Sequence, residues 1–281
     1  IFIALAVGVV LGAGPLQRSI NAGMNPSSSQ AASDPVLSAQ AEAEAAGLKA
    51  LASSTLTGSL TGTSVALVVL PGASDDDVSA IRSTLTDAGA SVVGRVTLTD
   101  NWQSTSMSQY RTTLATTLAS HLQSGGAKTA SADGVVGYSI VQVLTSTGAE
   151  TDLLRQILTD KSTPLMTIDE DPAGKATTLV AVGVRAQTTT STQASVAASS
   201  DAWIGLGLAV GSTSGVVVGD ASSREAMISQ IRTSGTAVTT VDSVGTTLAS
   251  VDTALALSTA SSGARAFGVG NGAQSVIPSS K

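Results

Sequence analysis

The sequence predicts an α/β fold, a Rossmann-like parallel sheet with flanking helices, preceded by an N-terminal transmembrane helix and a short Ala-rich helix. Short β-branched runs alternate with amphipathic helical patterns, which predicts helices on both faces of a sheet. The continuously apolar run SVALVVL at residues 64–70 is typical of a strand buried on both faces in a parallel sheet. The uncharged apolar run at residues 1–14 predicts the membrane helix.

Composition narrows the classes of function. The 281 residues suffice for a sizeable core, and small aliphatic side chains would build it, because 42% of residues are hydrophobic but only 2% are aromatic. A net charge of −6 without a Lys and Arg cluster argues against a nucleic-acid partner. The chain has no cysteine, so it forms neither disulfides nor thiolate metal sites.

Residues 1–14, IFIALAVGVVLGAG, are predicted to be an N-terminally truncated transmembrane anchor. The run is shorter than the roughly 20 residues of a spanning helix, but the sequence starts at Ile1 rather than Met, so we expect apolar residues upstream. A signal-peptide core is the alternative, since the run ends in small residues. Both interpretations place the main domain outside the cytoplasm, on the inner or outer envelope membrane, with the lipid bilayer as a partner.

Residues 15–61 are predicted to be a linker followed by a helix that can form a coiled coil and a homo-oligomer. Asn, Gly, Pro, Ser and Gln are typical of the linker, and Asp34 followed by Pro35 is typical of a helix start. One stripe of the helix is mainly small and aliphatic, so that its pairing would bury little surface. The stripe consists of Leu37, Ala41, Leu48, Leu51 and Thr55.

Residues 62–281 are predicted to form an envelope-side α/β domain in two halves, 62–186 and 194–281, separated by a Thr-rich run. In the first half, strands are expected at 64–70, 91–98, 164–168 and 177–184, with helices near 75–89, 105–123, 133–144 and 150–160. The second half shows the same alternation of strands and helices, with helices near 194–210 and 222–234 and strands at 215–220 and 236–241.

Candidate metal ligands are few. Asp75, Asp76 and Asp77 follow the first strand, where open α/β sheets place ligands, and can coordinate a hard cation; complementing the helix dipole is the competing interpretation. Residues 169–171, Asp-Glu-Asp, also follow a strand and can join the same crevice. His121 is a weaker candidate, since its apolar neighbours are typical of an ordinary helix histidine. Four methionines are scattered without chelating spacing, at Met24, Met107, Met166 and Met227.

Residues for catalysis or cofactor binding are not evident in the pattern. Gly268, Gly270 and Gly272 follow the last helix and open none, so a phosphate would find no helix N-terminus there; we expect a docking or turn segment. The sequence has one histidine and no recognisable Ser and His pair, so it does not indicate a hydrolase triad. The sequence therefore predicts a protein that is not an enzyme and has no cofactor.

Three stretches resemble the actinobacterial copper transporter family MctB: the opening FIALAVGVVLGAG, the strand, acidic turn, helix and strand of residues 70–98, and the tail. In the tail, a Thr-Val-Asp strand end, a helix ending in Ala-Leu and an aromatic-Gly-x-Gly-x-Gly-Ala stretch correspond to residues 240–242, 256–257 and 267–273. The resemblance spans nearly the whole chain. Residues 18–60 depart from the family's longer, more charged coiled coil.

The resemblance implies an anchored envelope protein with a role in copper efflux and homeostasis as a channel-forming component, so copper would be a transported ion. A SteB-like relative implies the alternative, a non-catalytic scaffold in cell separation that acts with a SteA-like membrane partner. Because Cu(I) and Cu(II) favour clustered Cys, Met or His ligands, the scattered ligands of this chain favour the scaffold on physical grounds.

Overall fold

The computed structural model describes residues 35–186, 197–259 and 263–278. The chain divides into two compact units, Ile1–Ala43 and Glu44–Lys281. The described part of the first unit is the beginning of a helix, and the second unit contains the whole α/β domain. The predicted anchor and the Thr-rich run lie outside the described residues. Among the residues that are described, no helix combines the length and the apolar character needed to cross a membrane.

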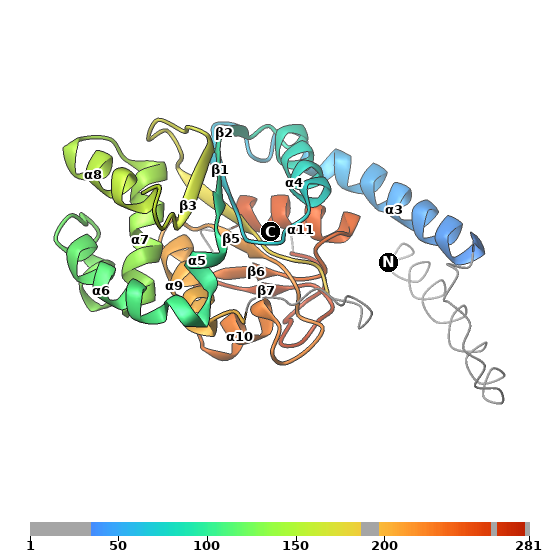
Figure 1. Cartoon of the computed structure of the whole chain (residues 1–281). Helices are drawn as coiled ribbons and strands as arrows, with labels where there is room; N and C mark the ends of the chain where they lie inside the picture. Colours follow the sequence, from blue (N-terminus) through green and yellow to red (C-terminus); the bar gives the residue numbers. More distant parts are fainter. Residues whose placement is uncertain (1–34, 187–196, 260–262, 279–281) are drawn as a thin grey trace, which may run out of the picture. The chain divides into compact units, whose positions relative to one another are not determined.

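Strands and helices are interspersed along the second unit (Figure 1). The strands are β1 (Ser64–Val69), β2 (Ser91–Leu98), β3 (Met166–Glu170), β4 (Thr178–Val182), β5 (Val216–Val218), β6 (Thr239–Val241) and β7 (Ala266–Phe267). The α-helices are α3 (Pro35–Leu56), α4 (Asp75–Asp87), α5 (Asp100–Gln103), α6 (Ser108–Ala119), α7 (Ala132–Thr145), α8 (Ala149–Leu158), α9 (Ser200–Gly211), α10 (Met227–Thr233) and α11 (Thr247–Ser258). Two 3-10 helices are η1 (Thr105–Met107) and η2 (Gly125–Thr129).

The strands form one sheet in the order β3-β2-β1-β4-β5-β6-β7. Because β1 pairs with β4 and β4 with β5, the two predicted halves share this sheet. The prediction of a parallel sheet is confirmed for every pair except one, since β3 runs antiparallel to β2 at the edge. The sequence of β3 could not reveal its direction. Its exposed polar positions, such as Thr167 and Asp169, suit an edge strand, where charged side chains discourage pairing with other chains.

Helices cover both faces of the sheet and create two cores (Figure 1). Successive residues of a strand point to opposite faces. Val65, Leu67 and Val69 of β1 therefore pack with α4, α11 and the end of α3, whereas Ala66 and Val68 pack with α6, α7, α8, α9 and α10. This alternation on a strand that is buried throughout explains why its sequence is continuously apolar.

Helix α3 begins at Pro35, as predicted, but the face through which it meets the domain shares only Leu48 with the predicted stripe. Ala52 and Leu56 are buried and Leu48 packs beside them, whereas Leu51 of the stripe remains 68% exposed. Ala52 and Leu56 fall one position after Leu51 and Thr55. They meet the apolar side of α4 and α11, which the sequence of α3 alone does not reveal.

Two predicted helices begin later than expected. Helix α10 starts at Met227 rather than near 222, because the carboxylate of Asp220 accepts hydrogen bonds from the backbone N–H and the hydroxyl of Ser222 and so forms a turn. Helix α9 starts at Ser200 rather than near 194.

Helices α7 and α9 approach so closely that glycine is required at their crossing. A Cβ atom on Gly205 would lie 2.5 Å from the carbonyl carbon of Asp133, and one on Gly137 would lie 2.6 Å from the carbonyl oxygen of Gly205. Both helices therefore depend on glycines that lower their intrinsic helix propensity.

Candidate functional site

The strand order reverses direction between β1 and β4, which is where open α/β sheets bind ligands. In this chain an ion pair occupies that point. Arg185 lies just beyond β4, and Asp77 lies in the first turn of α4. The Nε and Nη2 atoms of Arg185 donate hydrogen bonds to the carboxylate of Asp77, at 2.7 and 2.6 Å. The side chain of Asp77 is 3% exposed. A phosphate at this helix N-terminus would meet a carboxylate, so the arrangement disfavours nucleotides.

The acidic segments that were predicted to share a crevice do converge, but on arginines. Arg95 of β2 contacts Asp75 at 2.6 Å and Asp169 at 3.4 Å. Arg82 of α4 holds both carboxylate oxygens of Glu170 at 2.6 and 2.5 Å, and its hydrogen bonds hold the pKa of Glu170 below its usual value. These carboxylates therefore link α4 to the edge of the sheet.

The remaining acidic residues of the two segments, Asp171 and Asp76, do not contact Arg95 or Arg82. Arg155 of α8 donates to Asp171 at 2.6 Å and lowers the pKa of that carboxyl group, helped by the backbone N–H of Ala173. Asp76 lines a groove described below. Across the residues that the structure describes, no group of three or more His, Cys, Asp or Glu side chains could hold a metal ion.

His121 lies beyond the end of α6 and contacts a carboxylate group on a helix of the same layer. Its Nδ1 lies 2.5 Å from Oε2 of Glu150 in α8, and its carbonyl oxygen accepts a hydrogen bond from Gln142. Met166 and Met227 are buried in the core between the sheet and α7. Their burial is consistent with the expected role of filling gaps in the core, and they lie with aliphatic neighbours rather than with His121.

A groove of about 990 Å³ lies between the end of α3 and helices α4 and α11. Its walls are mostly small or hydroxyl-bearing side chains. They include Ala46, Ala50 and Ser53 of α3, Ala80, Ser83 and Thr84 of α4, and Thr247 and Ser250 of α11. Charged groups also line it, including Lys49, Asp76 and Asp87. Aromatic side chains are missing from these described walls, which suits a partner's backbone or small side chains better than a planar ligand.

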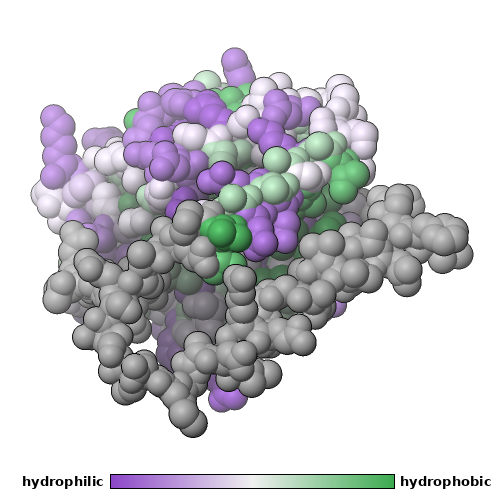
Figure 2. Space-filling model, turned by 90° about the vertical axis from the view of Figure 1, so that its right-hand side faces the viewer, coloured by the Kyte–Doolittle hydropathy of each residue, from purple (hydrophilic) through white to green (hydrophobic). Residues whose placement is uncertain are grey.

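Figure 2 shows one face of the molecule, coloured by hydropathy. Among its coloured residues, hydrophobic side chains occur in small groups between hydrophilic ones and pale ones of intermediate hydropathy.

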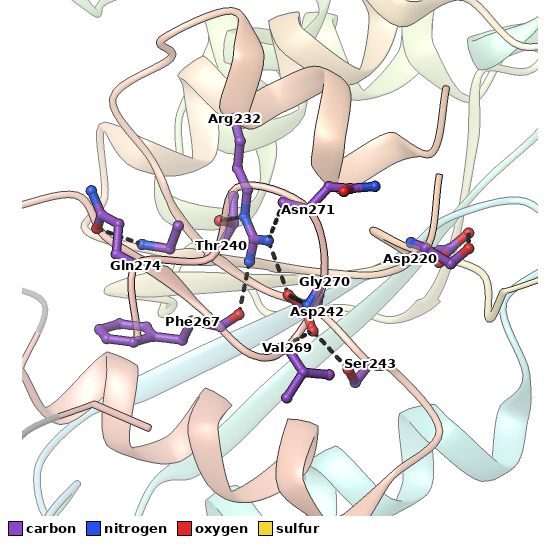
Figure 3. A network of polar contacts seen from close by, with 12 residues as sticks. Asp220, Arg232, Thr240, Asp242, Ser243, Phe267, Val269, Gly270, Asn271 and Gln274 are labelled. Atoms are coloured by element: carbon purple, nitrogen blue, oxygen red, sulfur yellow. Dashed lines mark hydrogen bonds and ion pairs between the residues drawn. The ribbon is translucent and has the colours of Figure 1, made fainter. Parts of the chain in front are cut away.

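The tail motif forms a polar network around Asp242, at the end of β6 (Figure 3). One carboxylate oxygen accepts from the backbone N–H of Val269 and the hydroxyl of Ser243, at 2.9 and 2.6 Å. The other accepts from the backbone N–H of Gly270 and from Nη1 of Arg232, both at 2.9 Å. The glycine-rich stretch is therefore a docking turn, as the sequence predicted, and its anchor is a carboxylate.

Arg232 completes this network from α10. It also donates to Thr240, to the carbonyl oxygen of Phe267 and to that of Asn271, at 2.9, 2.8 and 2.7 Å. The side chains of Arg232 and Asp242 are 7% and 1% exposed. Burial by itself raises the pKa of Asp242, but its hydrogen bonds outweigh this and hold the pKa below the usual value. Sequence reasoning found the motif but missed Arg232, which carries no motif of its own.

Gly268 allows the turn to reach the carboxylate. Its φ of +121° is rarely adopted by residues with a side chain, and a Cβ atom there would overlap the carboxylate of Asp242.

A second aspartate near this network is buried without hydrogen bonds that would offset the loss of water. Asp252 of α11 is 0% exposed, and neither carboxylate oxygen has a hydrogen-bond partner among the described residues. Burial, reinforced by the negative charge of Asp242, raises the pKa of Asp252 to about 8. No pattern in the sequence indicates its burial, because a lone polar residue in a helix is usually exposed.

These observations define a doubly wound α/β domain whose switch point is closed by an ion pair and whose last strands are tied together by a carboxylate network. The chain belongs to the MctB family: the family model described as copper transport outer membrane protein matches residues 1–278. A comparison with curated proteins found no match.

Proposed function

We propose that the chain takes part in copper efflux and homeostasis at the cell envelope, as a non-catalytic, membrane-anchored protein with its α/β domain outside the cytoplasm. The observation that carries this proposal is the match to the copper transport family over residues 1–278, a range that includes the apolar opening and the whole described domain. Copper is the transported ion in this proposal. The chain is a channel-forming component that builds its pore by assembly of several copies.

The side chains of the domain support a pore from assembly rather than a copper site within one chain. His121 would have to give up its contact with Glu150 to bind Cu(II) through Nδ1. Asp75 and Asp169 share Arg95, whose positive charge repels a metal ion. Soft ligands for Cu(I) are limited to methionines, two of which are buried in the aliphatic core.

Deletion of the gene is expected to lower the copper concentration that arrests growth of the source strain. The wild-type gene should restore tolerance, and a His121→Ala gene should restore it equally, because the ring is already engaged by Glu150. Growth curves over a copper series measure this. A deletion strain with unchanged copper tolerance would contradict the proposed transport role.

Calorimetric titration of the full chain with Cu(II) and, under reducing conditions, Cu(I) is expected to show no stoichiometric tight binding. The His121→Ala variant should give the same trace. Tight binding that disappears in this variant would instead make His121 a copper ligand and would overturn the view that copper passes only through an assembled pore.

A scaffold in cell separation, acting with a SteA-like membrane partner, is the second candidate. The groove between α3, α4 and α11 favours it, because its small and hydroxyl-bearing walls can admit a partner's chain. The same deletion strain separates the two candidates. Chained cells with normal copper tolerance would support the scaffold, whereas copper sensitivity with normal separation would support transport.

A further inference from the structure

Helix α11 buries a carboxyl group that the fold does not compensate. Both oxygens of Asp252 are inaccessible to solvent and lack hydrogen-bond partners among the described residues. Burial of a polar group without a partner costs stability, so an exception of this kind needs an explanation. The neighbouring carboxylate of Asp242 cannot help, because Ser243, Val269, Gly270 and Arg232 already occupy it.

The turn that leads into α11 contains backbone conformations that are uncommon for residues with a side chain. Ser243 and Gly245 between β6 and α11 adopt positive φ angles of 62° and 91°, and Gly263 beyond the helix has a φ of 97°. Positive φ is uncommon for a residue with a side chain such as Ser243. The N-terminal end of α11 is therefore joined to β6 by a turn rather than by regular structure.

Helix α11 is also a wall of the groove, through Ser250 and Val251, the two residues that precede Asp252. A movement of α11 would thus change the groove and hydrate the carboxyl group together. We propose that α11 is a proton-controlled wall of this groove: it stays closed while Asp252 is protonated and opens when Asp252 ionises.

The charged groups around α11 determine how Asp252 responds. They are Lys49 of α3, Asp76, Asp77 and Asp87 of α4, Arg185 beyond β4, Asp220 beyond β5, and the Asp242–Arg232 pair. Arg185 is held by Asp77, and Arg232 by Asp242. Asp242 is the charged group that raises the pKa of Asp252, in addition to burial. No cation among these groups contacts Asp252, so its ionised form gains stabilising contacts with water only when α11 opens.

The sign of the effect follows from linkage. In the closed state the pKa of Asp252 is about 8, and in an open, hydrated state it returns toward the ordinary value of 3.8. The open state therefore binds fewer protons between these values, and the opening constant rises about tenfold per pH unit across this window. Above about pH 8 both states are ionised and the constant becomes level.

Hydrogen exchange of the full chain, read by mass spectrometry and corrected for the intrinsic rate at each pH, tests this proposal. Between pH 5.5 and 7.5 the opening constant of α11 is expected to rise about 100-fold in the wild type. Helix α7, on the opposite face of the sheet, should show no such rise. In an Asp252→Asn variant the opening constant of α11 should no longer rise with pH. In an Asp87→Asn variant, which alters an exposed carboxylate of the groove, the rise should remain.

Several outcomes would overturn the proposal. If the opening constant of α11 in the wild type does not change with pH, that result alone contradicts the proposal, and no variant is needed. A slope that persists in Asp252→Asn would assign it to another group, and a slope shared equally by α7 would indicate global unfolding rather than movement of one helix. Thermal unfolding of Asp252→Asn at pH 6 verifies that the variant folds.

Discussion

Replacement of Asp242 by Ala is expected to destabilise the protein by roughly 3–5 kcal/mol, the usual range when one partner of a buried ion pair is removed. Arg232 would keep its charge at 7% exposure without a counter-ion, and the N–H groups of Val269 and Gly270 would lose their acceptor. We expect the turn that contains these residues to lose its hydrogen bonds to the end of β6. Urea unfolding at pH 7 measures the loss of stability.

A second substitution separates the charge from the turn. In an Asp242→Ala/Arg232→Met double variant, the uncompensated guanidinium is gone, so part of the lost stability should return. Equal stability of the single and double variants would show that the cost lies in the docking turn alone. An Asp242→Ala protein as stable as the wild type would refute the anchoring role of this carboxylate.

Replacement of Gly205 by Ala is expected to cost about 3 kcal/mol, because the added methyl group has backbone rather than flexible side chains in its way. Its Cβ atom would lie 2.5–2.6 Å from the carbonyl group of Asp133 and from the N atom of Gly134. Helices α7 and α9 would have to separate, and the core between them and the sheet would lose its close packing. Thermal or urea unfolding measures the difference.

Gly207 on the same helix provides a matched control. A Cβ atom there would lie 3.4–3.7 Å from side-chain methyl groups of Val238, Ile231 and Thr236, which is ordinary van der Waals contact. Gly207→Ala should therefore be neutral or stabilise the protein by up to about 1 kcal/mol through helix propensity. If both alanine variants behaved alike, close approach of the backbones at Gly205 would not explain the effect.

Much of the architecture could be predicted because local sequence patterns reflect local burial. Strand β1 is apolar throughout since both faces of the sheet are covered, and α4 shows a buried face at Val78, Ile81 and Leu85. Helix ends were less predictable where side chains compete with the helix. Asp220 binds the backbone N–H of Ser222 and delays α10, an effect that depends on the position of a single hydrogen bond.

The candidate site was only partly predictable. The acidic residues after β1 and on β3 were visible in the sequence, but their arginine partners come from distant positions, such as Arg95 for Asp75 and Arg185 for Asp77. The coiled coil, the homo-oligomer and the membrane anchor remain predictions. The direction of β3 and the face through which α3 meets the domain needed the three-dimensional arrangement, because both depend on which neighbours are present.

The sequence by itself determined the order of strands and helices, the aliphatic character of the core and the docking role of the glycine-rich tail, because each arises from periodicity or from the conformational freedom of nearby residues. Tertiary structure alone decided that Asp242 anchors that tail, that Arg232 balances it and that Asp252 lies buried without a partner. The physical reason is that charge compensation and desolvation depend on distances between groups far apart in the chain, which a linear pattern does not contain.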